Sequence, residues 1–233
     1  MFERLHVLSE SDCGEIRAVV YDLRDQWIPR NKQFPFFTLA TASYLDAATP
    51  GTCTSYCEMA AVYNSILKNR LSWLYGRLQQ ALAQHLGDPA NYAEPFALPG
   101  FHIFLAHEFF RKNVASVHCD LQYQLLDWGA PELVDFSRPI SFTLAISLPR
   151  SGAGLNLWDL QQKEIAGLSS WQLQMLIETR RKTHIPYEVG SMILHSGHSV
   201  HQIAPMTAVE PGEERITFQG HAVLRQGAWQ IYW

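Results

Sequence analysis

The stretch GSMILHSGHSVHQIAP, residues 190–205, is the part of the chain that decides the predicted fold. It reads as two short strands, SMILHS and HSVHQIAP, with a turn around Gly197. Three histidines, His195, His198 and His201, lie within it, and each could be an ordinary polar residue near a strand end. If the fold brings one of these imidazoles close to an acidic side chain and another histidine, the group could bind a metal ion.

The upstream segment VASVHCDLQY, residues 114–123, supplies the acidic residue and another histidine. The segment reads as a strand, and a strand places residues i and i+2 on one face, so His118 and Asp120 are predicted to project together. With a histidine from a neighbouring strand they form two imidazoles and one carboxylate, a set that suits non-haem Fe(II) and leaves one face of the metal open. Further along, Arg215 offers a guanidinium fork for a carboxylate-bearing co-substrate.

Other short strands surround these two segments. The runs are FHIFLAH, ISFTLAISL, GLNLWDL, RITFQGHAVL and WQIYW, all within residues 99–233. Together they make about eight strands, which is enough for a double-sheet jelly roll. A helical insertion is expected near residues 169–182.

Residues 1–98 are expected to form a helical layer. An apolar stripe at helical spacing predicts one long helix: Tyr63, Leu67, Leu71, Leu74, Leu78 and Leu82. A turn is expected before it at 49–51, and Gly87 and Pro89 should end it. Because this helix needs a sheet to bury its stripe, we predict a single α+β domain over residues 1–233. Its core would be a jelly roll with the N-terminal helices packed on one sheet.

The composition restricts the classes of partner. Of 233 residues, 47% are hydrophobic and 17% are charged, which favours a folded core over disorder. The net charge is −4 without any basic run, so nucleic acid is not an expected partner. The N-terminus lacks an apolar signal segment, and no run approaches the roughly 20 apolar residues of a membrane helix. The four cysteines show no paired zinc spacing, so we expect a cytoplasmic protein with reduced thiols.

The glycine-framed histidine resembles a segment of the Fe(II)/2-oxoglutarate-dependent dioxygenases. The residues that match the family pattern are Gly190, Gly197, His201, Ile203 and Pro205. His195 stands where the family usually has an aromatic residue. Downstream, Gly212 and Arg215 resemble the glycine and arginine of the segment that holds the distal carboxylate of 2-oxoglutarate, and Thr217 matches a hydroxyl position often paired with it. Arg215 follows His201 at a longer spacing than the family commonly has, with TAVEPGEE as an extended turn.

This resemblance implies a double-stranded β-helix that binds Fe(II) through His118, Asp120 and His201. It also implies 2-oxoglutarate as co-substrate, held by Arg215 and Thr217, and O2 as oxidant. The expected reaction hydroxylates an unactivated C–H of a small molecule, such as a free amino acid or natural-product precursor, and releases succinate and CO2. Related halogenases have a small residue at the position of Asp120, so the carboxylate implies hydroxylation, desaturation or cyclisation.

Five further residues are candidates for contact with the substrate. Gln122, Tyr123 and Trp128 follow the predicted ligand pair, whereas Gln219 and His221 alternate onto the same strand face as Arg215. Each could equally be a core residue or a polar group paired with a neighbouring strand. A metal-binding protein of the cupin type, without 2-oxoglutarate chemistry, is the alternative, because His195 and His198 could add ligands. The substrate and the oligomeric state are not determined by the sequence.

Overall fold

A computed structural model describes residues 2–48 and 52–233. Its strands are β1 (Phe2–His6), β2 (Ile28–Pro29), β3 (Phe36–Leu39), β4 (Ala90–Tyr92), β5 (Gly100–Leu105), β6 (Val134–Ser147), β7 (Gly154–Gln161), β8 (Lys182–Pro186), β9 (Ser191–Ser196), β10 (Ser199–Ile203), β11 (Glu214–Arg225) and β12 (Ala228–Tyr232). Its α-helices are α1 (Glu10–Asp22), α2 (Ser43–Asp46), α3 (Cys53–Leu86), α4 (Gln162–Ile165) and α5 (Ser170–Thr179). The turn expected at 49–51 lies outside the described residues.

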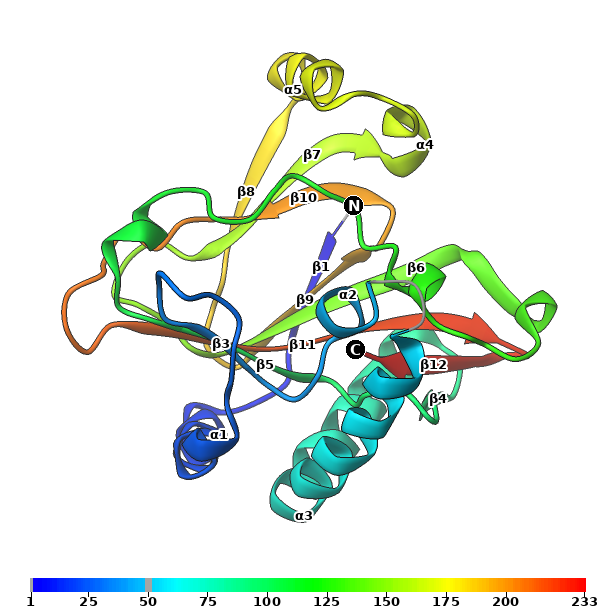
Figure 1. Cartoon of the computed structure of the whole chain (residues 1–233), viewed down its shortest axis with the longest axis horizontal. Coiled ribbons are helices and arrows are strands. Elements are labelled where there is room, and N and C mark those ends of the chain that lie inside the picture. The colour runs from blue at the N-terminus through cyan, green and yellow to red at the C-terminus, as the bar shows by residue number, and fades with distance from the viewer. Residues whose placement is uncertain (1, 49–51) are drawn as a thin grey trace.

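Two sheets face each other, and their strand pairs are antiparallel except for the parallel pair of β12 and β4. The main sheet has the order β1-β9-β6-β11-β5-β3-β2, and β12 pairs with β11 and with β4. The minor sheet has the order β10-β7-β8. Figure 1 shows the minor sheet on one side of the main sheet and helices α1 and α3 on the other. The α+β jelly-roll architecture predicted from the sequence is therefore confirmed.

Helices α1 and α3 cover the outer face of the main sheet. The predicted stripe of α3 is buried from Leu67 to Leu82, and the helix ends at Gly87 as expected. It packs in one apolar core with Ile216 and Phe218 of β11. No helix in the described ranges is long and apolar enough to span a membrane.

Two expectations about secondary structure were wrong. Residues 1–98 contribute four strands as well as helices, and β1 and β3 join the main sheet beside β9 and β5. Residues 114–123 form no strand, because only His118 makes a bridge, to His201 of β10. The N–H of Asp120 turns instead to the carbonyl of Gly197, and Gln122–Leu125 form a 3-10 turn, so no ladder continues. Hydrophobic alternation alone cannot reveal that a segment lacks a neighbour to pair with.

The face of β11 that points toward the minor sheet carries a row of polar side chains. Arg215, Thr217, Gln219 and His221 alternate with the outward Ile216, Phe218 and Ala222, which lie in the helix-covered core. Across the sheet, Thr217 lies opposite His102 of β5, and His221 lies opposite Ser141 of β6. The space between the two sheets is therefore lined by polar side chains from several strands.

Candidate metal centre and carboxylate site

Three side chains predicted as metal ligands converge between the sheets. The Nε2 atom of His118 lies 3.5 Å from Asp120 Oδ1, and the Nε2 atom of His201 lies 3.3 Å from Asp120 Oδ2. All three potential ligand atoms lie within 4.8 Å of one another. Ligands at right angles on a metal with bonds of about 2.1 Å would be roughly 3 Å apart, so the group fits one ion bound on a single face.

The backbone holds these residues together despite the missing strand. His118 and His201 exchange two backbone hydrogen bonds of 3.0 and 2.9 Å, and the N–H of Asp120 donates to Gly197 O at 2.7 Å. A Cβ on Gly197 would lie 2.8 Å from Asp120 O, so only glycine permits this close approach. Gly190, the other framing glycine, has φ +80° and accepts the N–H groups of Val7 and Leu8. Each glycine thus allows a distant segment to pack on this part of the chain.

The orientation of both imidazoles suits metal binding. His118 Nδ1 lies 2.8 Å from Ser116 O, and His201 Nδ1 lies 2.9 Å from Ser199 O. A neutral imidazole that donates Nδ1–H to a carbonyl presents the lone pair of Nε2, and Nε2 is the atom that faces Asp120 in both residues. Gln122 donates from Nε2 to Asp120 Oδ1 at 2.9 Å and so orients the carboxylate.

Electrostatics favour the ligand protonation states. Burial lowers the pKa of His201 to about 3, so this imidazole is neutral. Burial alone would raise the pKa of Asp120, but the neighbouring His201 and His118 hold it well below its usual range. Burial would also lower the pKa of His118, yet the hydrogen bond and charge of Asp120 raise it overall. Near neutral pH the site offers an ionised carboxylate, and a cation would displace any proton shared with His118.

Arg215 is a buried cation without a carboxylate partner among the described residues. It is 2% exposed, its guanidinium lies 4.0 Å from the centre of the Phe104 ring, and Nη1 donates to Ala204 O at 3.0 Å. Burial lowers its pKa to about 10, so it stays charged at neutral pH. Because a buried charge with so few partners is costly, the arrangement suits an anionic ligand.

The other polar residues on β11 extend from Arg215 toward the metal group. Thr217 is buried and accepts a 3.0 Å hydrogen bond from Gln219. His221 is buried, its Nδ1 lies 3.2 Å from Ser141 Oγ, and its Nε2 has no hydrogen-bond partner in the described structure. Burial lowers the pKa of His221. His221 lies at the metal end of the row, because it is opposite Ser141 of β6, which is opposite His195 of β9, and the His195 ring is 4.5 Å from that of His201.

Two candidate substrate contacts lie instead in the apolar core. Tyr123 stacks on Phe136 with ring centroids 4.9 Å apart, and its hydroxyl lies 3.1 Å from His198 Nε2. Trp128 is 6% exposed and donates from Nε1 to the carbonyl of Tyr123. The structure thus places Gln122, Gln219 and His221 around the site but packs Tyr123 and Trp128 beside it.

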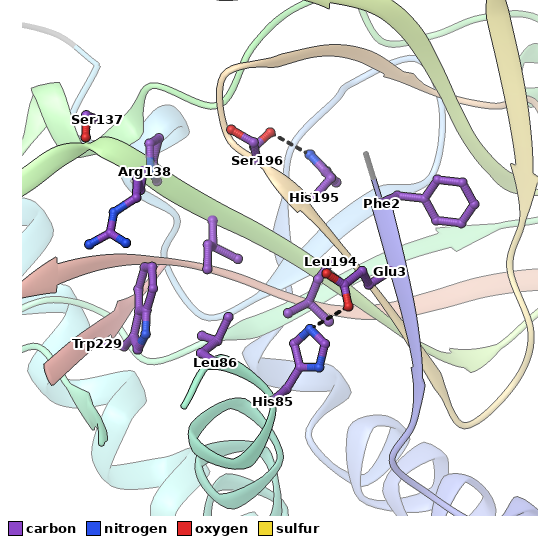
Figure 2. A pocket seen from close by; sticks show the side chains of 12 residues that line it. Phe2, Glu3, His85, Leu86, Ser137, Arg138, Leu194, His195, Ser196 and Trp229 are labelled. Atoms are coloured by element: carbon purple, nitrogen blue, oxygen red, sulfur yellow. Dashed lines mark hydrogen bonds and ion pairs between the residues drawn. The ribbon is translucent and has the colours of Figure 1, made fainter. Parts of the chain in front are cut away.

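The competing histidines do not join the ligand group. His195 is buried, with its ring 4.5 Å from that of His201, but it is not one of the three side chains whose possible ligand atoms lie within 4.8 Å of one another. His198 faces Tyr123. His195 lines a pocket of about 330 Å³ whose walls also include Phe2 and Glu3 of β1 and His85 and Leu86 at the end of α3. Figure 2 shows these side chains around the pocket. None of the three converging ligands lines that pocket, so it is separate from the metal group.

Sequence reasoning missed His102 and Tyr44. His102, on β5, is 4% exposed and hydrogen bonds through Nε2 with the hydroxyl of Tyr44. Alternation along FHIFLAH would have placed His102 and Phe104 on one face, but which face is inward follows only from pairing with β11. No local sequence pattern indicates Tyr44. It lies before the long helix and contacts His102 only because the fold brings together two residues that are 58 positions apart.

Comparison with known proteins gives a structural likeness without a sequence match. No family model matches the chain, and no curated protein matches it. A solved N-substituted L-amino acid dioxygenase from Burkholderia ambifaria AMMD is similar, with a TM-score of 0.62, 14% identity and coverage of 99% of this chain and 85% of that chain. The 2-oxoglutarate-dependent non-haem epimerase SnoN of nogalamycin biosynthesis has a TM-score of 0.55 at 12% identity, over 96% of this chain and 77% of that chain.

A third solved structure extends the likeness. The non-haem 2-oxoglutarate-dependent carbocyclase SnoK has a TM-score of 0.51 at 12% identity, over 100% of this chain and 92% of that chain. All three cover nearly the whole of this chain, helices and both sheets included. The chain therefore has the fold of the Fe(II)- and 2-oxoglutarate-dependent oxygenases.

Proposed function

We propose that the protein is an Fe(II)- and 2-oxoglutarate-dependent oxygenase that hydroxylates an unactivated C–H of a small molecule. The observation that supports it most is the convergence of His118, Asp120 and His201 in a chain whose inner sheet face also holds Arg215, which is buried and has no carboxylate partner among the described residues. The first group fits one divalent metal, and the second fits an anion. A similar fold has been solved in complex with 2-oxoglutarate, which supports this co-substrate.

The residues have separate roles in this proposal. His118, Asp120 and His201 would hold Fe(II), Gln122 would orient the carboxylate, and Arg215 with Thr217 would bind the distal carboxylate of 2-oxoglutarate. When bound, Fe(II) and 2-oxoglutarate use O2 to oxidise a C–H bond, with succinate and CO2 as by-products. His118 has 37% of its side chain exposed, whereas His201 has 5%, so access to the site is from the His118 side.

The substrate is proposed to be a free amino acid or a natural-product precursor. The solved relatives in fold include an amino acid dioxygenase and enzymes of nogalamycin biosynthesis, which supports a small molecule. The relatives also include an epimerase and a carbocyclase, so desaturation or cyclisation is the alternative outcome on the same site. We propose a single domain over residues 1–233 and a cytoplasmic location.

Succinate formation tests this function. Purified protein with Fe(II), O2 and 2-oxoglutarate should form succinate faster when the correct member of a panel of amino acids and small metabolites is present. The product mass should rise by one oxygen and should contain no chlorine in chloride-rich buffer, because Asp120 occupies the position a halide would need. Loss of two hydrogens would indicate desaturation, whereas no 2-oxoglutarate turnover with any substrate would favour the cupin-like alternative.

A further inference from the structure

His102 and Tyr44 form a buried pair next to Arg215 that the proposed metal ligands do not use. His102 lies on β5 directly opposite Thr217 of β11, so the two side chains are neighbours on the inner face of the main sheet. Its ring is enclosed by aromatic side chains, with the Phe36 and Trp233 rings 5.3 and 5.4 Å from it. Its Nδ1 atom is buried and has no hydrogen-bond partner in the described structure.

The hydrogen bond from Tyr44 determines which nitrogen of His102 carries the proton. Burial, followed by the charges of Arg215 and Arg30, lowers the pKa of His102 to about 3, so the ring is neutral. Burial also raises the pKa of Tyr44, so its hydroxyl keeps its proton. If that hydroxyl donates to Nε2, both groups of the pair are satisfied and the remaining proton is on Nδ1. The reverse arrangement would leave the Tyr44 O–H without an acceptor, so the structure favours an unpaired Nδ1–H donor on His102.

The position of the His102 Nδ1–H donor indicates which ligand group could accept its hydrogen bond. Arg215, Thr217, Gln219 and His221 follow one another on the inner face of β11. His221 is at the metal end, because it lies opposite Ser141 of β6, Ser141 lies opposite His195 of β9, and the His195 ring is 4.5 Å from that of His201. A ligand that contacts Arg215 at one end and the metal at the other must therefore pass over Thr217. Directly opposite Thr217 stands His102, whose pKa is influenced by both Arg215 and Asp120.

We propose that His102 Nδ1–H donates to the distal carboxylate of 2-oxoglutarate, as a third group beside Arg215 and Thr217, and that Tyr44 is the positioning residue that fixes its tautomer. This inference rests on the proposed function. The His102 donor adds selectivity for a 2-oxo dicarboxylate, because a 2-oxo acid without the distal carboxylate would leave the Arg215 charge and the His102 Nδ1–H without an anionic partner.

Binding of two co-substrate analogues to the Mn(II)-loaded protein tests the proposal without any turnover. Isothermal titration calorimetry would compare 2-oxoglutarate with 2-oxopentanoate, which has the same carbon chain but no distal carboxylate. His102→Phe keeps a ring but removes the donor, and it should weaken 2-oxoglutarate binding about 10- to 150-fold, the range for a hydrogen bond to a charged group. Binding of 2-oxopentanoate should not change.

Two further variants separate hydrogen bonding from folding. His102→Asn places an amide N–H near the position of Nδ1 and should recover part of the lost affinity. Tyr44→Phe keeps the ring of His102 but removes the hydroxyl that determines which nitrogen carries the proton. It should therefore cause a smaller loss of affinity, confined to 2-oxoglutarate. His6→Asn, at an exposed residue of β1, is the matched control and should bind both 2-oxo acids as the wild type does.

The outcomes distinguish the role of His102 from the proposed function of the protein. Unchanged 2-oxoglutarate affinity in His102→Phe, or an equal loss for both 2-oxo acids, would overturn the role of His102 while leaving the proposed function in place. A wild-type protein that binds Mn(II) but neither 2-oxo acid would instead contradict the proposed function. If His102→Phe does not fold, Tyr44→Phe and His102→Asn give the same comparison.

Discussion

Asp120 is the residue on which the proposed metal group depends most, because its two carboxylate oxygens face the two imidazoles separately. It is 8% exposed and is held by three contacts: both histidines and the amide of Gln122. Without the carboxylate, two neutral imidazoles remain as ligands, and the negative charge that attracts a divalent ion is lost. The roles of Asp120 and Gln122 can therefore be separated by their effects on metal affinity.

Asp120→Ala should reduce Fe(II) or Mn(II) affinity by more than about 100-fold, and Gln122→Leu by about 10- to 100-fold, the range for a residue that orients a metal ligand. Calorimetric titration with Mn(II) measures both. Gln124→Leu is the control, because Gln124 is an exposed residue of the same 3-10 segment. This variant should bind Mn(II) normally. Wild-type metal affinity in Asp120→Ala would show that the ligand assignment is wrong.

Arg215→Lys should raise the 2-oxoglutarate concentration needed for half-saturation, because a lysine cannot reproduce the two-pronged contact of a guanidinium with a carboxylate. Loss of one charge-assisted hydrogen bond costs about 1.5–3 kcal/mol, or roughly 10- to 150-fold in affinity. Titration of 2-oxoglutarate into the Mn(II)-loaded variant measures this loss. If Arg215→Ala retained normal affinity, a different basic residue would have to bind the carboxylate.

Among the elements, the loop that carries His118 and Asp120 is positioned by the turn between β9 and β10. Gly197 accepts the Asp120 N–H, donates its own N–H to Pro139 O of β6, and leaves no room for a Cβ. This single turn therefore connects the ligand loop to both the main and the minor sheet. The loop needs no strand ladder of its own, because its bridge to His201 and its contact with Gly197 fix it at two points.

Gly197→Ala should destabilise the protein by about 1–3 kcal/mol, as extra atoms do in a closely packed region, and should weaken Mn(II) binding. The added Cβ would lie 2.8 Å from Asp120 O and 3.2 Å from Pro139 Cβ. Gly14→Ala, within α1 where nothing lies within 4 Å, should be neutral or stabilising. Thermal unfolding with and without Mn(II) measures both effects, and equal behaviour of the two variants would contradict the proposed contact.

In the molecule as a whole, the two sheets enclose several buried imidazoles: His102, His195, His201 and His221. Burial lowers the pKa of each, to about 3 for His102 and His201. The unfolded chain would take up protons at these residues near the ordinary value of 6.5, whereas the folded protein keeps them neutral. Protons therefore favour the unfolded state as the pH falls below about 6.5, and the folded protein loses stability down to the folded-state pKa.

The metal-free protein should consequently lose stability between pH 7 and pH 5. A histidine with a pKa of 6.5 unfolded and about 3 folded contributes a loss of about 2 kcal/mol at pH 5. Urea unfolding at both pH values measures the change, and His102→Phe should show a smaller difference between them than the wild type. A stability that rises from pH 7 to pH 5 would contradict the neutral, buried state of these rings.

The sequence by itself determined the class of fold and the identity of the residues that converge. Hydrophobic spacing at residues 63–82 identified the long helix, and the sequence pattern that contains Gly190 and Gly197 singled out His201. These are local properties, because helical periodicity and glycine geometry depend on a few neighbouring residues. The pairing of His118 and Asp120 was also predicted correctly, although the strand expected to produce it is a loop.

Only the tertiary structure decided which strands are neighbours, and with them the rest of the site. β1 and β3 come from the part of the chain expected to be helical, and they became recognisable as strands only beside β9 and β5. Tyr44 and His102 meet across 58 positions of sequence, and His102 faces Thr217 through the register of β5 and β11. A strand's partner and register follow from the burial of whole faces between distant segments, a property that no local stretch of sequence contains.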